Sequence, residues 1–205
     1  MIGVLDYGIG NVSSIVNMLK KLGLTAALVS SVEEIQTTDK LILPGIGSFD
    51  AGMQKLRQSG LADAIIQYAA IDEKPLLGIC LGMQMLGRTS EEGKEMGLAL
   101  IPFVNRRFCF IDKSNLKIPH MGWEVTEIML ESDPIVQNLD PMQRYYYVHS
   151  YHAVCDNEEN VLMRCVYGYS FAAAVKHKKI YGVQFHPEKS HKFGMAFLDN
   201  FARRV

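Results

Sequence analysis

The stretch PLLGICLGMQML, residues 75–86, decides the fold and directs the search for function. It begins with the apolar run PLLGIC, which predicts a buried strand, and passes directly into LGMQML, which has helical spacing. Cys80 stands at the junction, with Gly78 and Gly82 two residues away on either side. This spacing is typical of a nucleophile elbow, whose strained turn leaves room only for glycine at those positions. The alternative is a small buried cysteine beside packing glycines, and the strand and helix around Cys80 favour the nucleophile.

The first half of the chain repeats this alternation of strand and helix. Apolar runs predict strands at IGVLDY (2–7), TAALVS (25–30) and KLILPG (40–45). Amphipathic spacing predicts helices at NVSSIVNMLKKLG (11–23), AGMQKLRQSGL (51–61) and ADAIIQYAA (62–70). Continuous apolar strands alternating with helices indicate a parallel sheet that is covered on both faces.

After about residue 100 the pattern changes to shorter strands. These are RRFCFI (106–111), WEVTEIM (123–129), RYYYVHSYHAVC (144–155), VLMRCVYG (161–168), FAAAVKHKK (171–179) and IYGVQFHP (180–187). The KHKK segment is too short for a crossover, so some of these strands should be antiparallel. Residues 190–205 predict a final helix with one aromatic face. Because no linker or repeat interrupts the chain, we expect a single domain over 1–205.

Composition excludes several classes of protein. The formal net charge of −1 gives no indication of a nucleic-acid or membrane-surface partner. No apolar stretch approaches the ~18 residues of a membrane span, and the opening MIGVLDYGIGN lacks the basic region of a signal peptide. The four cysteines form no CxxC pair, which favours a reduced, cytoplasmic protein. We expect no metal and no cofactor.

A cysteine nucleophile needs an imidazole to take its proton and a third group to orient the ring. His186 in GVQFHPEKS ends a predicted strand, and Glu188 follows two residues later, on the same side of an extended chain. Pro187 between them ends the strand. The alternative is a surface His-Pro turn with a solvated glutamate.

The other histidines are weaker candidates. His149 and His152 in YVHSYH would point to opposite faces of one strand, which argues against a shared metal site and favours polar positions in the core or at its rim. His177 and His191 are expected to be exposed. For His120 in IPHMGW, the sequence does not decide between a structural and a functional role.

Acyl chemistry also needs donors for the developing oxyanion. LPGIGSF (43–49) follows a predicted strand and is flexible enough to turn backbone N–H groups inward, although the same residues would also suit an ordinary Pro-Gly turn. The early segment DYGIGN contains the pattern G-x-G, but Ser13 stands where a dinucleotide-binding loop needs its third glycine, so it matches that kind of loop poorly.

With PGIGSF, GICLGMQ and GVQFHPEKS in this order, the sequence resembles the class I glutamine amidotransferases. DYGIGN, SEEG, IPHMGW and YYYVHSYHA resemble, more narrowly, the glutaminase subunits of imidazole glycerol phosphate synthases, and the resemblance covers the whole chain. It implies a flavodoxin-like three-layer α/β/α fold with a mostly parallel central sheet and additional antiparallel strands. It also implies hydrolysis of glutamine to glutamate and ammonia by a triad of Cys80, His186 and Glu188.

The resemblance carries over further residues. It implies oxyanion donors at Gly45, Ile46, Gly47 and Leu81, and substrate contacts at Gln84, Glu92, Ser150 and Tyr151. It implies a partner too, a (β/α)8-barrel cyclase subunit of histidine biosynthesis that receives the ammonia across an interface with Asn11, Trp123, Tyr146 and Lys189. Without the resemblance, these four would be interpreted as a helix-start residue, a core tryptophan, a strand aromatic and a solvated lysine.

Three alternatives remain open. HKFGM follows HPEKS where histidine-pathway members usually have small residues, and this resembles paralogues that supply ammonia for amidino-sugar synthesis in surface polysaccharides. Another cysteine hydrolase of similar fold would not need Gln84 or the HPEKS pairing. A non-catalytic relative would be expected to lose part of the triad.

Overall fold

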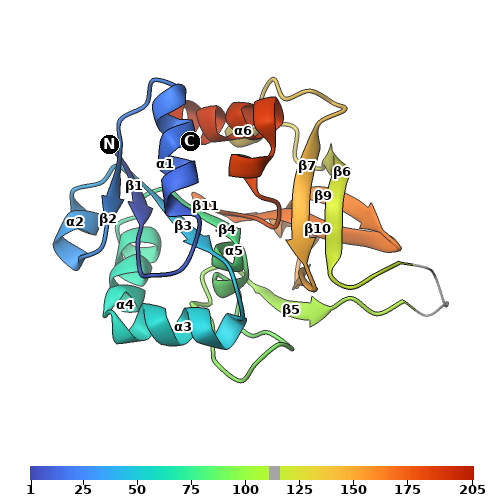
Figure 1. The fold of residues 1–205 in the computed structure, drawn as a ribbon, viewed down its shortest axis with the longest axis horizontal. Coiled ribbons are helices and arrows are strands. Elements are labelled where there is room, and N and C mark those ends of the chain that lie inside the picture. The colour runs from blue at the N-terminus through green and yellow to red at the C-terminus, as the bar shows by residue number, and fades with distance from the viewer. Residues whose placement is uncertain (111–115) are drawn as a thin grey trace.

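The computed structural model describes residues 1–110 and 116–205, and its described strands form one mixed eleven-stranded sheet (Figure 1). One half is parallel, in the order β2-β1-β3-β4-β11. Its strands are β1 (Ile2–Leu5), β2 (Ala26–Val29), β3 (Lys40–Gly45), β4 (Leu76–Cys80) and β11 (Ile180–Val183). The predicted parallel sheet is therefore confirmed.

The other half of the sheet is antiparallel and continues from β11 in the order β10-β9-β6-β7, with β8 joining β10 to β5. Its strands are β5 (Phe103–Arg107), β6 (His120–Ile128), β7 (Arg144–His149), β8 (Tyr151–Cys155), β9 (Val161–Tyr167) and β10 (Tyr169–His177). Lys178 and Lys179 form the tight turn between β10 and β11, as the short KHKK segment predicts.

Helices cover both faces of the parallel half (Figure 1). One face carries α1 (Val12–Lys21) and α6 (His191–Arg204), and the other carries α2 (Val32–Gln36), α3 (Phe49–Gln58) and α4 (Leu61–Ile66), followed by a π-helical turn at Gln67–Ile71. The short α5 (Leu81–Met85) follows β4 directly. Burial of the apolar side of each helix against the sheet gives the expected three layers.

Three expectations about single elements were wrong or incomplete. The predicted strand 144–155 breaks at Ser150 into β7 and β8. The strand predicted at 106–111 is observed at Phe103–Arg107, because Phe108 and Phe110 enter an aromatic cluster instead, while residue 111 lies outside the described residues. The five-residue helix α2 was not predicted.

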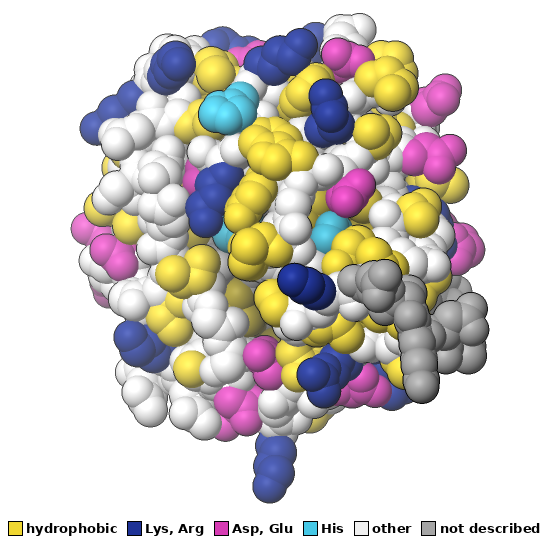
Figure 2. Space-filling view, turned by 45° about the vertical axis from the view of Figure 1, so that its right-hand side comes forward, with side chains coloured by type: hydrophobic (Ala, Val, Ile, Leu, Met, Phe, Trp, Pro, Cys, Tyr) yellow, Lys and Arg dark blue, Asp and Glu magenta, His cyan; other side chains and the backbone are white. Residues whose placement is uncertain are grey.

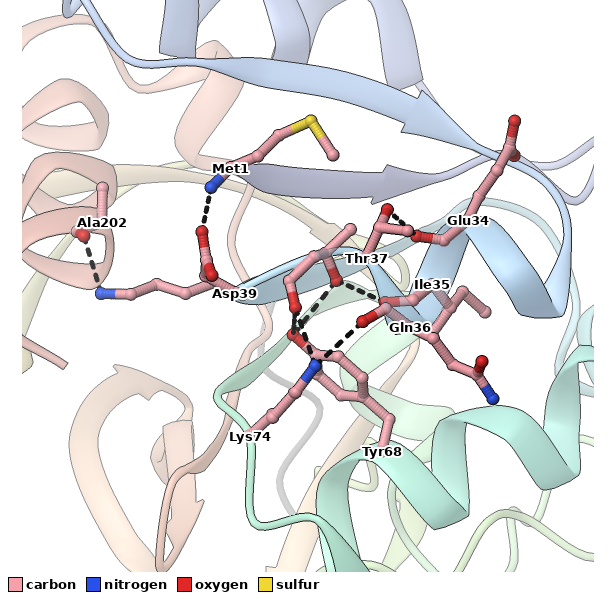
Figure 3. A network of polar contacts seen from close by, with 11 residues as sticks. Met1, Glu34, Ile35, Gln36, Thr37, Asp39, Tyr68, Lys74 and Ala202 are labelled. Carbon is pink, nitrogen blue, oxygen red and sulfur yellow. Dashed lines mark hydrogen bonds and ion pairs between the residues drawn. The ribbon is translucent and has the colours of Figure 1, made fainter.

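Polar contacts fix the amino-terminal ends of the central strands (Figure 3). Lys74 donates to the carbonyl oxygens of Gln36 and Thr38, both at 3.1 Å, and the Thr38 hydroxyl lies 3.2 Å from that of Tyr68. Lys40, the first residue of β3, donates to the carbonyl oxygens of Phe201 and Ala202 in α6 and to a backbone oxygen of Val205. These contacts tie the amino-terminal edge of the sheet to the surrounding helices, whereas ligands of open α/β sheets bind at the carboxyl-terminal edge.

Within the described ranges, none of the helices combines the length and apolar character needed to cross a membrane.

Candidate active site

A pocket of about 300 Å³ opens where β3, β4 and β11 end side by side. The register sets Gly45 beside Cys80 and Ile79 beside Val183, so the residues that follow each strand leave the sheet at one edge. The pocket brings together most of the predicted site residues, namely Ile46, Gly47, Cys80, Leu81, Gln84, Glu92, Ser150, Tyr151 and His186. Gly45 and Glu188 lie behind this lining.

Cys80 occupies the strained turn that its glycine neighbours predict. Its backbone has φ 54° and ψ −111°, outside the regions that side-chain-bearing residues favour. A Cβ on Gly82 would lie 1.9 Å from the carbonyl oxygen of Leu43, and one on Gly78 would lie 2.7 Å from the carbonyl oxygen of Gly82. Neither position accepts even alanine without a backbone shift, so the flanking glycines are required by the turn itself.

His186 and Glu188 form a buried pair beside the pocket. Nδ1 of His186 lies 2.8 Å from Oε1 of Glu188, and the two side chains are 2% and 1% exposed. A carboxylate can only accept, so Nδ1 carries a proton and Nε2, on the other side of the ring, is the nitrogen that can exchange a proton with Cys80. Nε2 is among the buried atoms that have no partner in the described part of the chain.

The electrostatics of His186 are set by its neighbours. Burial lowers its pKa, but the neighbouring side chains of Cys80 and Glu188 outweigh burial and raise the pKa to about 9. Cys80 and Glu188 therefore both favour the protonated ring, from its two opposite sides. This arrangement can remove a proton from sulfur and return it to a leaving group.

The segment after β3 is anchored at its start. A Cβ on Gly45 would lie 2.8 Å from the backbone nitrogen of Gly82, so the two backbones are in close contact. The Tyr7 hydroxyl donates to the carbonyl oxygen of Pro44 at 2.8 Å. Burial and the charge of Cys80 raise the pKa of Tyr7, so this hydroxyl stays protonated as a donor. Beyond the anchor, Ile46 is exposed and Gly47 has φ 95°.

Two of the predicted substrate residues hold backbone groups at the pocket wall. Oε2 of Glu92 accepts from the backbone nitrogen of Phe49 at 2.8 Å, at the start of α3. Nε2 of Gln84 donates to the carbonyl oxygen of Tyr151 at 3.3 Å and to Oε1 of Gln184 at 3.1 Å. Gln184 was not predicted from the sequence, because it looks like one more residue of an apolar strand.

The four predicted interface residues lie outside the pocket. Trp123 and Tyr146 make an edge-to-face contact with ring centroids 6.0 Å apart, and Nζ of Lys189 lies 5.7 Å from the centre of the Tyr146 ring. Trp123 is 40% exposed, so its interpretation as a core tryptophan is wrong. Asn11 stands at the start of α1 without capping it through its side chain. Figure 2, in which the right-hand side of Figure 1 comes forward, shows several hydrophobic side chains near the middle of that face, among charged ones.

One continuous strand was expected to point His149 and His152 to opposite faces, and that expectation is wrong. Because the chain breaks at Ser150, the rings of His149 and His152 both pack against Phe108, at 5.1 and 4.8 Å between centroids. Nε2 of His149 lies 3.0 Å from Nδ1 of His120. All three are buried, as expected of core histidines. No group of metal ligands occurs among the residues that the structure describes.

The chain is similar to known proteins over essentially its whole length. Residues 3–205 match the family model for class I glutamine amidotransferases. The chain is 48% identical to imidazole glycerol phosphate synthase subunit HisH 2 of Pseudomonas aeruginosa, over 100% of both chains. It is 43% identical to subunit HisH of Sulfurimonas denitrificans, over 99% of this chain and 98% of the relative.

Solved structures share the fold at lower identity. PurLQS from Thermotoga maritima has a TM-score of 0.71 at 20% identity, covering 98% of this chain and 96% of that one. The glutaminase domain of the CTPS of Trypanosoma brucei has a TM-score of 0.64 at 15% identity, covering 100% and 94%. At these identities the likeness concerns the fold alone.

Proposed function

This chain belongs to the class I glutamine amidotransferases, and we propose that Cys80, His186 and Glu188 form its catalytic triad in the glutaminase subunit of an imidazole glycerol phosphate synthase. The observation that carries the proposal is the buried His186–Glu188 pair, at 2.8 Å, which leaves Nε2 of His186 without a hydrogen-bond partner among the described residues, beside the pocket that Cys80 lines. A cysteine on a strained turn, an imidazole beside it and a carboxylate behind the imidazole are the parts that acyl transfer needs.

The first half of the reaction forms a covalent intermediate. His186 takes the thiol proton of Cys80 while sulfur attacks the side-chain carbonyl carbon of glutamine, and the carbonyl oxygen becomes an oxyanion. Donors from the Gly45–Gly47 segment and the Leu81 amide stabilise that charge. The carbon–nitrogen bond then breaks, the proton passes from His186 to the leaving nitrogen, and ammonia departs from a glutamyl thioester.

The second half regenerates the enzyme. His186 takes a proton from water as the water oxygen attacks the thioester carbon, and collapse of the intermediate breaks the carbon–sulfur bond. Glutamate leaves, and the proton on His186 returns to the sulfur of Cys80. Glu188 keeps Nδ1 protonated throughout and thereby keeps Nε2 as the working nitrogen.

The pocket walls suit an amino-acid substrate. A volume of about 300 Å³ is at the small end of the range for ligand sites. We propose that the Glu92 carboxylate pairs with the α-ammonium group and that Gln84, Ser150 and Tyr151 hold the polar ends of glutamine. No cofactor is needed for this chemistry.

Ammonia released here needs a receiver, and the relatives named above are described as subunits of a synthase. We propose a heterodimer with a (β/α)8-barrel cyclase that docks over Asn11, Trp123, Tyr146 and Lys189 and takes up ammonia before water protonates it. Residues 1–205 would act as one domain, in the cytoplasm, where the four free cysteines remain reduced.

Loss of the nucleophile tests the assignment. In the complex with the cyclase, Cys80→Ala should abolish synthesis from glutamine and preserve synthesis from added ammonium salts. Cys109→Ala, at an exposed free cysteine, is the matched control and should keep both activities. Wild-type glutamine turnover by Cys80→Ala would refute the triad. Glutaminase activity that never reaches the cyclase product would instead point to the amidino-sugar acceptor that the HKFGM segment suggests.

A further inference from the structure

Gln184 is a fully buried polar side chain that contacts the sulfur of Cys80. It follows the last residue of β11, it is 0% exposed, and its Nε2 lies 3.8 Å from Sγ of Cys80. Its backbone nitrogen donates to the carbonyl oxygen of Ala173 at 2.9 Å, which holds the residue against β10. The residue therefore has a fixed position beside the reacting atom, although no step described above uses it.

The orientation of the Gln184 amide follows from one backbone group. The carbonyl oxygen of Tyr151 can only accept, so the group of Gln84 that faces it, at 3.3 Å, must be the NH₂. The same NH₂ faces Gln184 at 3.1 Å, so the oxygen of the Gln184 amide points to Gln84. The remaining end of that amide, the NH₂, then points to the sulfur.

We propose that Gln184 is a further catalytic residue of this site, donating an N–H to the sulfur of Cys80 and so stabilising it as a thiolate. This inference rests on the proposed role of Cys80 as nucleophile. A hydrogen bond to an anion is stronger than one to a neutral group, so the contact favours the thiolate over the thiol. The low polarity of a buried site strengthens that preference.

The contact acts at two moments of the reaction. Before attack it lowers the free energy of the thiolate that forms as the proton moves to His186. When the thioester breaks down, it lowers the free energy of the departing sulfur. Gln84 takes part by holding the Gln184 oxygen, which keeps the amide from rotating away.

Removal of the donor tests the inference. Gln184→Met keeps the length of the side chain and deletes the N–H, and Gln184→Glu replaces the amide by an acceptor. The readout is the pH at which the rate of Cys80 alkylation by iodoacetamide in the folded chain reaches half its maximum. Mass spectrometry of the peptide that contains Cys80 measures that rate. We expect a shift to higher pH of about one unit for Met, a tenfold loss of thiolate at neutral pH, and a larger shift for Glu.

Kinetics give a second readout. The value of kcat should fall about tenfold or more in Gln184→Met, with little change in KM, because the N–H acts on sulfur and not on bound glutamine. Gln184→Asn, which withdraws the donor by one methylene, replaces Met in this test if the Met variant does not fold.

Gln143→Met is the matched control. Gln143 is also buried, and its amide joins the carbonyl oxygen of Thr126 at 3.4 Å and the Tyr145 hydroxyl at 2.7 Å, without contacting Cys80. It should lower the melting temperature and leave the alkylation midpoint unchanged. A folded Gln184→Met with the wild-type midpoint and wild-type kcat would overturn the inference, whereas an active Cys80→Ala would overturn the proposed function itself.

Discussion

The indole of Trp123 lies flat against the imidazole of His191, with ring centroids 5.4 Å apart and planes 5° apart. His191 is exposed and has φ 46°, a left-handed conformation that non-glycine residues rarely adopt. Tyr146 and Lys189 lie next to this stack. We call Trp123, Tyr146, Lys189 and His191 the proposed docking surface, since tryptophan and tyrosine side chains often anchor protein interfaces.

Trp123→Ala should weaken binding of the cyclase by tenfold or more, because loss of an interface tryptophan that acts as an anchor typically costs about 2 kcal/mol. Titration calorimetry with the purified cyclase measures the dissociation constant. Leu28→Ala is the control, since Leu28 is likewise exposed but lies on β2, at the opposite edge of the sheet. Equal losses in the two variants would show that the partner binds elsewhere.

The isolated chain should hydrolyse glutamine slowly and be activated when the cyclase and its nucleotide ligand are added. The Pro44 carbonyl is pinned by Tyr7, while Ile46 and Gly47 beyond it are exposed, so a peptide of this segment can rest with its N–H turned away from the pocket. Contacts that favour the inward state by a few kcal/mol suffice to shift such an equilibrium. Steady-state assays with and without partner measure the effect, and full activity of the chain alone would exclude this gating.

The free energy of unfolding should fall as the pH drops below about 6.5. Burial lowers the pKa of His149 to about 3 and that of His120 to about 4. Between pH 6.5 and 4 the unfolded chain therefore binds more protons than the folded one, and each histidine contributes a slope of up to about 1.4 kcal/mol per pH unit. Urea unfolding at several pH values measures the slope.

Substitution identifies the groups responsible for that slope. His120→Gln should make the dependence on pH less steep, whereas His177→Gln, at an exposed position beside the β10–β11 turn, should not. An unchanged slope in His120→Gln would assign the acid sensitivity to other groups.

Cys80 should be the cysteine on which activity depends. Burial raises the pKa of Cys155 and Cys165 to about 12, so both remain unreactive thiols in the folded chain, while Cys109 is exposed. Iodoacetamide at neutral pH should modify Cys80 and Cys109 and spare the other two. A folded chain with Cys109→Ser, Cys155→Ala and Cys165→Ala should keep its glutaminase rate, and loss of activity there would reveal a second functional thiol.

The sequence predicts those parts of the site that depend on local geometry. Gly78 and Gly82 reveal the elbow because the same turn that exposes sulfur excludes any Cβ there. The pairing of His186 with Glu188 is predictable because residues two apart in an extended segment face the same side. The missed helix α2 also has a local signal, because Ser31 and Glu34 form a capping box that is legible as S-x-x-E.

Features that depend on distant contacts were not predictable in the same way. Gln184 looks like any strand residue until Gln84 and Cys80 are seen beside it. The break at Ser150 carries no glycine or proline, and it is required because β7 pairs with β6 whereas β8 pairs with β5 and β10. Trp123 was predicted at the partner interface only through the resemblance, because its residue type alone indicates a core position, and its exposure is decided by what the sheet leaves uncovered.

The place of β11 in the sheet also bears on how the protein is made. Gln184 and Cys80 are 104 residues apart in the chain, and β11 lies between β4 and β10, in the middle of the finished sheet. A nascent chain on the ribosome therefore displays its thiol long before the strand that brings His186 has been synthesised. Such an unfinished polypeptide has a nucleophile without a base, so it cannot hydrolyse glutamine until translation is nearly complete.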